Sequence, residues 1–416
     1  MEIPAFVCVT LIVLISIGFP IFMALGISGI VGLFLSKGGA ILGLAVTSFY
    51  GQLNSFEMIA LPLFILMGQV LSKTPIGRDL FEVAAKWLMW LPGGLAIASV
   101  GACTIFGAVS GVSIAGVAAI GSLAVPQMVN RGYDRKLAAG CVVTAGALSM
   151  LIPPSVPFII YSAVTGESVA KLFIGGIVPG VVIALLLSLL IFFWALWKPE
   201  LAPRGEELEV SWKERFASLG KIWHAGVLIL LVLGSIYSGF STPTEASAVG
   251  AAGAFLIAGF AYRILTVELV KQILLESLRI SAAILLIIAC AKIFGDYLNM
   301  VRLPQALTEY LLSFQLPGIM VVFILMVLLI ALGMFMDAVS LIVVTTPILL
   351  PLIQALGFSP LWYGIILVIN LELAVVTPPV GLNLYTLKGV CPFLSIEEII
   401  RSSIPFLIIE FLALIV

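Results

Sequence analysis

Long apolar runs are the feature that most limits what this chain can fold into. Several of them, such as residues 172–197, reach the ~20 residues that an α-helix needs to cross a bilayer. The 416 residues are 62% hydrophobic and 10% charged, which leaves too little charge to cover a soluble protein of this length. A transmembrane β-barrel would instead show short segments of alternating polarity. We therefore expect an all-α polytopic membrane protein.

Reactive side chains are few and scattered. His224 is the single histidine and follows Trp223 at the edge of an apolar run, which favours an interfacial position over a metal site. The five cysteines form no CxxC pair and lie in apolar surroundings, as small core residues do. No GxxxxGK[ST] motif for nucleotide binding occurs. We expect no enzyme activity and no cofactor, and the net charge of −1 argues against a nucleic-acid partner.

Lysine and arginine gather in a few polar segments between the apolar runs. The positive-inside rule assigns such segments to the cytoplasm. They are 73–86, 131–136, the loop 199–221 with Arg204, 263–279 and 388–401. The first basic residue is Lys37, so the chain lacks the charged start of a cleavable signal, and we expect its first apolar run to stay in the membrane.

Two apolar runs predict re-entrant hairpins. Residues 93–130 contain no charge, yet both flanks are basic and expected on the cytoplasmic side. A hairpin that bends within Phe106–Gly116 satisfies both conditions. Residues 317–357 predict a second hairpin, which bends near Gly333–Ser340 and has uncharged flanks, so that it should open from the other side. Non-helical backbone at membrane depth must be buried in protein or line a wet cavity, so two hairpins indicate a central site.

The chain carries one broken-helix element twice. "SMLIPPSVPFIIY" and "AVVTPPVGLNLY" contain its only two Pro-Pro pairs, Pro153-Pro154 and Pro378-Pro379, at an offset of 378 − 153 = 225. Proline removes an amide donor and breaks helices. Each pair therefore predicts an interruption of an apolar run, in 137–166 and in 361–387.

The doubled element predicts two repeats. We count about five crossings and one hairpin in each half, 1–198 and 222–416. An odd number of crossings inverts the second half relative to the first and leaves both termini outside the cytoplasm. Inverted repeats whose broken helices meet near the bilayer midplane are the architecture of many secondary transporters.

The two breaks would offer ligands near the middle of the membrane. Freed carbonyl oxygens suit a small cation such as Na⁺, and the N-termini of half-helices suit a carboxylate. A cation and an anion held side by side stabilise each other, which couples their movement. The hairpin tips add small residues and hydroxyls: Ser110, Gly111, Ser113, Gly333, Asp337 and Ser340. Structural proline kinks and small-residue packing between helices are the alternative explanations for the breaks and for the two serines of the first tip.

The charged residues of the apolar runs differ in what they predict. Asp337 is the only charge between Glu309 and Glu372, and a carboxylate inside the membrane costs several kcal/mol unless it is used. We expect Asp337 to be a cation ligand or a coupling group. Glu372 lies five residues before Thr377 and either shares in function or holds the second break rigid.

Two further charged positions have open roles. In "STPTEA" the spacing of Thr242, Pro243 and Glu245 predicts a capping box at a helix start, and a contact with a subunit or substrate is the alternative for Glu245. Arg302 lies on the expected outer side, where it could attract an anion or pair with Asp296.

At these residues the sequence resembles a known family. "SGVSIAG", "LIPPSVPFIIY", "STPTEASAVGA", "GMFMDAVSLIVVTTPILLPL" and "NLELAVVTPPVGLNLY" are similar to motifs of the large membrane (M) subunit of tripartite ATP-independent periplasmic (TRAP) transporters, in order over essentially the whole chain. The resemblance implies Na⁺-driven uptake of organic acids such as C4-dicarboxylates or sialic acid across the bacterial inner membrane. It also implies a periplasmic substrate-binding (P) protein and a small four-helix membrane (Q) subunit as partners.

The resemblance further implies a mechanism and site residues. The hairpins and broken helices would move as an elevator against a scaffold built partly from 3–72 and 222–298. The Na⁺ sites would involve Ser110, Ser113, Ile152, Pro153, Gly333, Asp337, Thr377 and Pro378. Substrate binding or coupling would involve Gly111, Pro154, Ser155, Ser340, Pro379, Gly381 and Asn383. Val112 stands where the family commonly has a second serine, so one hydroxyl ligand is missing there, and the end of the chain at Val416 within an apolar run predicts a short or missing C-terminus.

Three other functions compete with a TRAP permease. A stand-alone Na⁺/carboxylate symporter of similar fold would work without a binding protein. An intramembrane enzyme would need an acid–base or metal constellation that one histidine and scattered carboxylates do not supply. A passive channel would not depend on a Na⁺ gradient.

Overall fold

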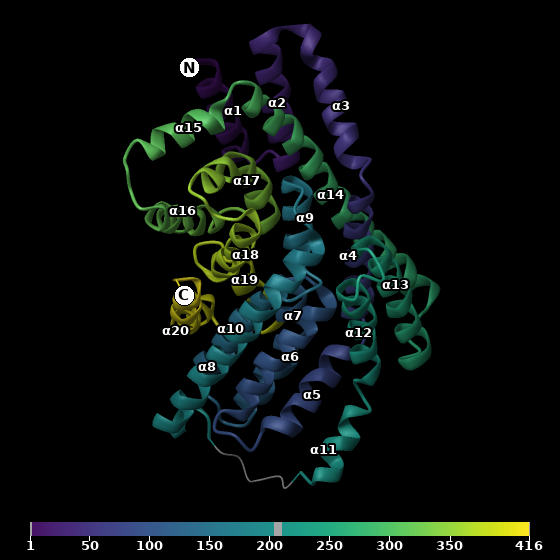
Figure 1. Ribbon diagram of the computed structural model, residues 1–416. Helices are drawn as coiled ribbons and strands as arrows, with labels where there is room; N and C mark the ends of the chain where they lie inside the picture. The colour runs from purple at the N-terminus through teal and green to yellow at the C-terminus, as the bar shows by residue number, and fades with distance from the viewer. Residues whose placement is uncertain (1, 204–209, 416) are drawn as a thin grey trace.

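The computed structural model describes residues 2–203 and 210–415 and is helical throughout (Figure 1). No strand occurs in these ranges, which confirms the expected all-α class. Arg204 of the expected cytoplasmic loop and Val416 lie outside the described residues. The inverted relation of the two halves stays a prediction.

The first half contains α1 to α10. Their bounds are α1 Glu2–Ser16, α2 Ile21–Lys37, α3 Leu42–Leu53, α4 Ala60–Ser72, α5 Ile76–Leu88, α6 Gly94–Ser110, α7 Ser113–Asn130, α8 Arg135–Ala147, α9 Val156–Thr165 and α10 Val169–Trp197. The short 3₁₀ turn η3, Leu148–Met150, follows α8 directly.

The second half contains α11 to α20. Their bounds are α11 Trp212–Leu219, α12 Trp223–Tyr237, α13 Pro243–Leu256, α14 Val267–Met300, α15 Leu303–Leu312, α16 Gly318–Gly333, α17 Ala338–Ala355, α18 Pro360–Val376, α19 Leu382–Val390 and α20 Ile396–Ile415. A π-helical turn, η5 Ile257–Ala261, extends α13.

Helix length separates complete spans from interrupted ones. Five helices in the described residues are long and apolar enough to cross a membrane, namely α7, α10, α13 with η5, α14 and α17, and two bent pairs bring the number to seven. The other apolar helices, among them α6, α9, α16 and α18, have 10–17 residues. They are short because a turn or a proline break ends each of them.

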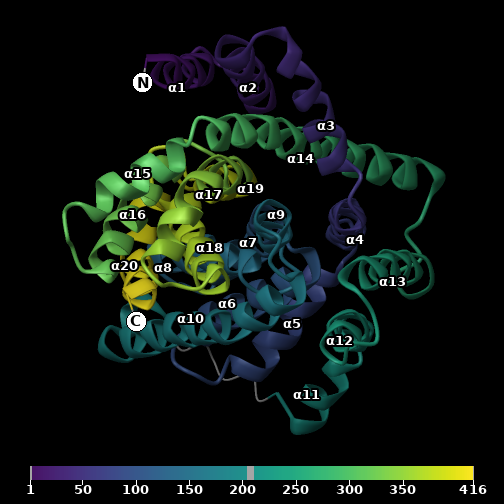
Figure 2. The ribbon, with the colours of Figure 1, turned by 45° about the horizontal axis from the view of Figure 1, so that its top comes forward.

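The helices form two spatial groups. In Figure 2 the long α14 runs along one edge with α2 and α3 outside it, and α4, α12 and α13 continue around a second edge. The helices α6–α10 and α16–α20 cluster inside this border. Packing of α2 on α14, of α4 on α13 and of α12 on α13 holds the border together.

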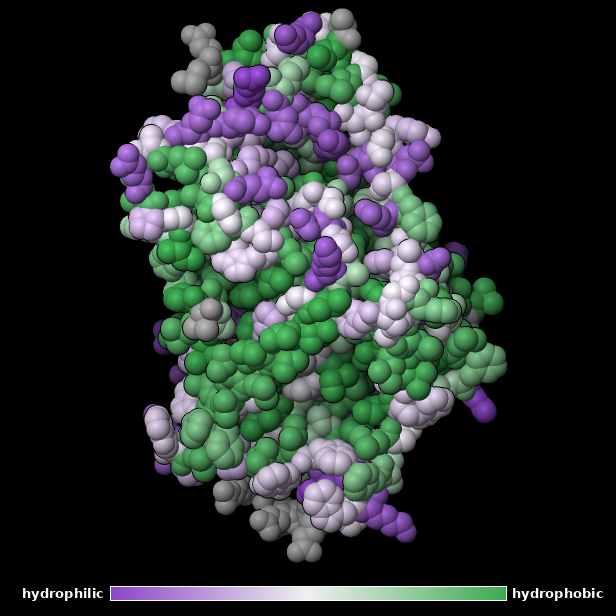
Figure 3. Space-filling view, viewed as in Figure 1, coloured by the Kyte–Doolittle hydropathy of each residue, from purple (hydrophilic) through white to green (hydrophobic). Residues whose placement is uncertain are grey.

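Hydrophobic residues cover the surface where lipid would lie. Figure 3 shows them across the middle and lower parts of the visible face, while hydrophilic residues gather toward the end near α15. Exposed phenylalanine and leucine side chains, such as Phe193 on α10 and Leu230 on α12, contribute to this surface. A soluble protein rarely exposes so much contiguous apolar surface.

Contacts bring together the five basic segments expected in the cytoplasm. Lys73 pairs with Glu276 at 2.9 Å, and Lys221 pairs with Glu82 at 2.8 Å. The Asp134 amide donates to the Leu201 carbonyl at 2.8 Å. The start of α20 packs on the start of α8, near Arg135 and Lys136. These contacts are what a common side of the membrane requires.

Small residues allow α2 and α14 to pack closely. A Cβ atom on Gly29 would lie 2.9 Å from the Phe294 backbone nitrogen, and one on Gly32 would lie 2.7 Å from the Tyr297 ring. Inside a membrane, close van der Waals packing replaces the hydrophobic effect as the main source of helix association.

Gly29→Ala is therefore expected to destabilise the protein by about 1–3 kcal/mol, because the new methyl group overlaps backbone that cannot rotate away. The readout is the thermal unfolding midpoint in detergent. Gly43→Ala, on neighbouring α3, is the matched control because a Cβ there meets nothing within 4 Å. Equal midpoints for the two variants would contradict close packing of α2 on α14.

Candidate functional site

The first hairpin tip lies against the first proline break. Helix α6 ends at Ser110, α7 begins at Ser113, and Gly111 between them has φ +66°. A Cβ on Gly111 would lie 2.6 Å from the Pro154 carbonyl oxygen. Only glycine combines this backbone conformation with this close approach, so the tip reaches the main chain of the break.

Two buried hydroxyl groups near this contact have no partner. Ser149 Oγ lies where Cβ atoms on Gly107 and Gly116 would approach it, at 2.6 and 3.0 Å, so it sits between the two arms of the hairpin. Neither Ser149 Oγ nor Ser110 Oγ has a hydrogen-bond partner among the described residues, although both serines are buried. Buried polar atoms are normally paired, so the two free oxygens mark a candidate cation site.

The first break uses one hydroxyl for its own structure. The chain leaves helical geometry after η3 and resumes it at Val156, with Ile152, Pro153 and Pro154 all buried between. Ser155 Oγ donates to the Met150 carbonyl and accepts from the Phe158 amide at 3.4 Å. Ser155 thus caps α9 and pairs one freed carbonyl, which is a structural role beside the substrate role that the resemblance implies.

The second break has the same form. Helix α18 ends at Val376, α19 begins at Leu382, and the Thr377 hydroxyl donates to the Leu373 carbonyl at 2.6 Å. The peptide bonds within Pro153-Pro154 and Pro378-Pro379 are both cis. Pro378 is half-buried and Pro379 is exposed, in contrast to the buried first pair.

The second hairpin also touches its break. A Cβ on Gly333 would lie 2.5 Å from the Ala374 side chain, so the end of α16 packs on the last turn of α18. Asp337 follows in the tip and is half-buried. Its carboxylate accepts from the Ser340 amide at 3.1 Å and from the Ser340 hydroxyl, which caps α17. Sequence reasoning missed this cap, although Asp at a helix start is a strong capping signal.

Contacts across the two halves bring the broken helices together. Asn383 Nδ2 donates to the Val143 carbonyl at 3.2 Å, and Tyr161 Oη donates to the Pro360 carbonyl at 2.6 Å. Helix α18 packs on α8, α9 and η3. Asn383 Oδ1 is buried without a partner in the described chain, so Asn383 joins the halves and still offers an acceptor.

Two of the four half-helices start without a side-chain cap. Ser155 caps α9 and Asp337 caps α17, but Val112 before α7 and Gly381 before α19 provide no capping hydrogen bond. The first amides of a helix carry partial positive charge and suit an anion. The uncapped starts of α7, at the buried Ser113, and of α19 are therefore the candidate anion-binding ends.

Two carboxylates share the apolar interior behind the second break. Glu372 on α18 and Glu410 on α20 are fully buried, and their carboxylate oxygens have no hydrogen-bond partners within the described ranges. The two groups lie close enough for their charges to interact. A pair of unpaired negative charges would be strongly destabilising there. Glu410 was missed at the sequence level, although a lone charge within the apolar run 402–416 was a visible signal.

The remaining charged candidates have local partners or none. Glu245 forms the expected capping box, because the Thr242 amide donates to its carboxylate at 2.8 Å and its own amide donates to Thr242 Oγ1 at 3.3 Å. Asp296 pairs with Lys292 at 2.7 Å rather than with Arg302. Arg302 is exposed and has φ +56° at the start of α15. No group of three His, Cys, Asp or Glu side chains that could hold a metal occurs in the described part of the chain.

These features define a class of protein. Spanning helices, two proline breaks and two hairpin tips packed on those breaks belong to polytopic helical membrane transporters.

A comparison with protein families specifies the class further. Residues 8–416 match the family model "Tripartite ATP-independent periplasmic transporter, DctM component". The chain belongs to this family of TRAP transporter large permeases.

Individual relatives agree with the family. The chain is 37% identical to the C4-dicarboxylate TRAP transporter large permease protein DctM of Pseudomonas aeruginosa, over 94% of this chain and 91% of that protein. It is 35% identical to the protein of the same name from Vibrio cholerae, over 99% and 94%. It is also 35% identical to the isethionate TRAP transporter permease protein DctMQ of Oleidesulfovibrio alaskensis, over 94% of this chain and 61% of that longer protein.

Solved structures share the fold at low sequence identity. The YdaH transporter of Alcanivorax borkumensis superposes with a TM-score of 0.64 at 14% identity, over 91% of this chain and 88% of that one. MtrF of Neisseria gonorrhoeae gives a TM-score of 0.59 at 14% identity, over 95% and 92%. Both likenesses concern the fold alone.

Proposed function

We propose that this chain moves an organic acid, together with Na⁺, across the bacterial inner membrane, with both termini in the periplasm. The relatives from V. cholerae and P. aeruginosa bear names for C4-dicarboxylate permeases. A C4-dicarboxylate is therefore the first substrate to test, and a sialic-acid-like solute is the second.

The observation that carries this proposal is the contact of the first hairpin tip with the first break. Gly111 lies on the Pro154 carbonyl, and the unpaired hydroxyl oxygens of Ser110 and Ser149 are buried in the same region. Na⁺ is a hard cation that prefers oxygen ligands, and broken helices supply such oxygens in transporters of this architecture. Val112 supplies no hydroxyl ligand at the tip. In this proposal the Ser149 hydroxyl is a further Na⁺ ligand in the same site.

The uncapped helix starts support a carboxylate site. The amides at the start of α7 and of α19 have no side-chain acceptor from their capping positions. A carboxylate bound there would be paired with Na⁺ bound at the breaks, and each would lower the cost of dehydrating the other. Asn383 would contribute a polar side chain from α19.

The two spatial groups of helices support an elevator movement. In this proposal the border helices, together with α1, form the scaffold expected from 3–72 and 222–298. The inner group contains both hairpins and both broken helices. In this proposal the inner group moves as a body against the border and carries the solute with it.

Two protein partners belong to the proposal. A periplasmic substrate-binding protein would deliver the solute, and a small four-helix membrane subunit would brace the border. The relative named DctMQ is longer than this chain, which covers 61% of it. A joined permease in that relative supports a small subunit beside this chain.

Reconstitution into proteoliposomes tests the function as a whole. With the binding protein and the small subunit present, succinate uptake is expected to require an inward Na⁺ gradient. The driving force is roughly 2.3 kcal/mol per elementary charge for each 100 mV of potential. Uptake without the binding protein would favour a stand-alone symporter, and uptake without any Na⁺ gradient would favour a channel.

Asp337→Asn separates the coupling role of Asp337 from its capping role. Asparagine caps helices about as well as aspartate, so the variant is expected to keep the wild-type unfolding midpoint. Removal of the charge is expected to abolish Na⁺-dependent uptake. Wild-type uptake in this variant would leave Asp337 with the helix cap as its only role.

The free hydroxyls are tested by alanine substitution. Ser110→Ala and Ser149→Ala are each expected to raise the Na⁺ concentration for half-maximal uptake about tenfold, which corresponds to about 1.4 kcal/mol of lost binding. Ser99→Ala is the matched control, because Ser99 is equally buried on α6 but donates to the Leu95 carbonyl at 2.8 Å. Na⁺ titrations that coincide for all three variants would show that the two serines serve only in helix packing.

A further inference from the structure

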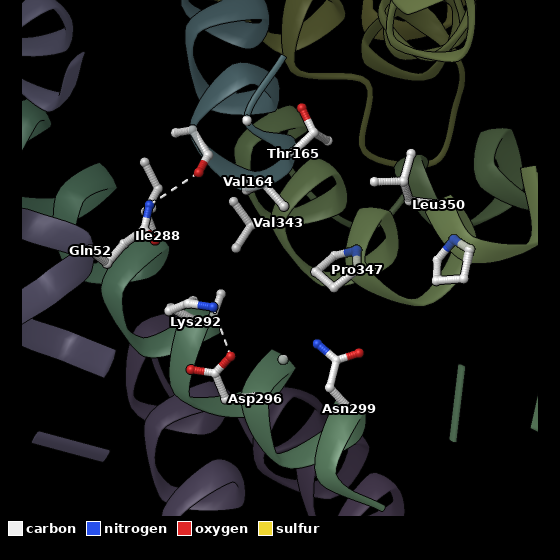
Figure 4. A pocket seen from close by; sticks show the side chains of 15 residues that line it. Gln52, Val164, Thr165, Ile288, Lys292, Asp296, Asn299, Val343, Pro347 and Leu350 are labelled. Carbon is white, nitrogen blue, oxygen red and sulfur yellow. Dashed lines mark hydrogen bonds and ion pairs between the residues drawn. The ribbon is translucent and has the colours of Figure 1, made fainter. Parts of the chain in front are cut away.

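A cavity of about 410 Å³ lies apart from the hairpin tips and the proline breaks (Figure 4). Its walls come from α3 and α14 on one side and from α9 and α17 on the other. The volume falls within the range of small-molecule sites, about 300–1,000 Å³. Of the residues that line it, only Asp296 was considered in the sequence, as a partner for Arg302.

One wall is polar and carries a lysine in an ion pair, whose ammonium group has further donors to offer. Lys292 Nζ pairs with Asp296 Oδ1 at 2.7 Å, and Ser48 Oγ donates to Asp296 Oδ2 at 2.6 Å, so both carboxylate oxygens already have donors. An ammonium group has three donors, and the Lys292 side chain is 46% exposed. Figure 4 shows Lys292, Asp296 and Asn299 on one face of α14, toward the cavity.

Two side-chain amides, of Gln52 and Asn299, complete the polar wall. Gln52 Nε2 donates to the Ala163 carbonyl at 3.2 Å, which ties α3 to the end of α9. Asn299 is exposed and lies on the same face of α14, so that its side-chain amide is available to a ligand.

The opposite wall is apolar. Val343, Pro347 and Leu350 of α17 face the lysine across the cavity (Figure 4). A cation with amide donors on one side and a hydrocarbon surface on the other fits a carboxylate attached to a short carbon skeleton.

We propose that this cavity is a docking site for the transported organic acid, with Lys292 as the residue that holds its carboxylate. This inference rests on the proposed function. In that function α3 and α14 belong to the border and α9 and α17 to the moving group, so the cavity spans the boundary between them. A solute there would have left the binding protein and not yet reached the breaks.

Amine labelling of the complete wild-type complex, without Na⁺, tests binding without transport. An N-hydroxysuccinimide ester of acetic acid acetylates accessible lysines, and peptide mass spectrometry reads each site. Millimolar succinate is expected to slow acetylation of Lys292 about tenfold, as occupancy of a weak anion site would. Lys271, exposed on the same helix, is the internal control and should be unaffected. Equal protection by neutral succinamide, or none by succinate, would overturn the docking site.

The kinetics of succinate uptake by Lys292 variants provide a second test of the docking site. Lys292→Gln is expected to raise the KM for succinate about tenfold at unchanged kcat and to remove its dependence on ionic strength. Lys292→Arg should restore both, and Gly295→Leu, which fills the cavity without a change of charge, should raise the KM as Lys292→Gln does. A KM that stays at the wild-type value in Lys292→Gln would reduce the lysine to an ion-pair partner of Asp296.

The two proposals fail in different ways. Protection of Lys292 by succinate in a complex that transports nothing would keep the docking site and remove the proposed function. Na⁺-driven uptake with an unprotected Lys292 and an unchanged KM in Lys292→Gln would do the reverse.

Discussion

Every interruption of a helix inside a bilayer must find partners for the backbone groups that it frees, because lipid supplies none. The two proline breaks meet this constraint locally. Ser155 pairs with the Met150 carbonyl, and Thr377 pairs with the Leu373 carbonyl. A hairpin also packs on each broken helix: Gly111 approaches the Pro154 carbonyl at the first break, and Gly333 approaches Ala374 in the last turn of α18. The inner group of helices is organised around these two contacts.

The same packing leaves buried polar atoms unpaired at several places in the described chain, and two of them, Ser110 Oγ and Ser149 Oγ, lie at the first hairpin. Most hydroxyls in the described helices donate to a carbonyl of their own helix, as Ser99 does. Ser110 and Ser149 do not, although they are equally buried. A free oxygen in a close-packed interior costs stability, so it is expected where a ligand completes the structure. The cavity at Lys292 is less demanding, because solvent or an anion can accept hydrogen bonds from the donors that remain free there.

Carboxylates illustrate how far sequence reasoning reaches. A lone charge in an apolar run drew attention to Asp337 and Glu372, and the capping box around Glu245 followed from spacing alone. The same reasoning passed over the cap that Asp337 forms with Ser340 and the neighbour that Glu372 has in Glu410. The cap was a local signal that went unused. The pairing of α18 with α20 left no local signal in the sequence, because the hydrophobic periodicity of a helix does not state which other helix it faces.

The amino-acid sequence by itself determined the membrane environment, the all-helical class, the position of both breaks and the family. Each of these depends on local composition or on residues within one motif. Only the tertiary structure decided that Ser149 lies between the arms of a hairpin, that Asn383 joins the two halves, and that Lys292 lines a cavity with α17. These relations join residues far apart in the chain, and they follow from how helices of similar apolar surface select one another by close packing.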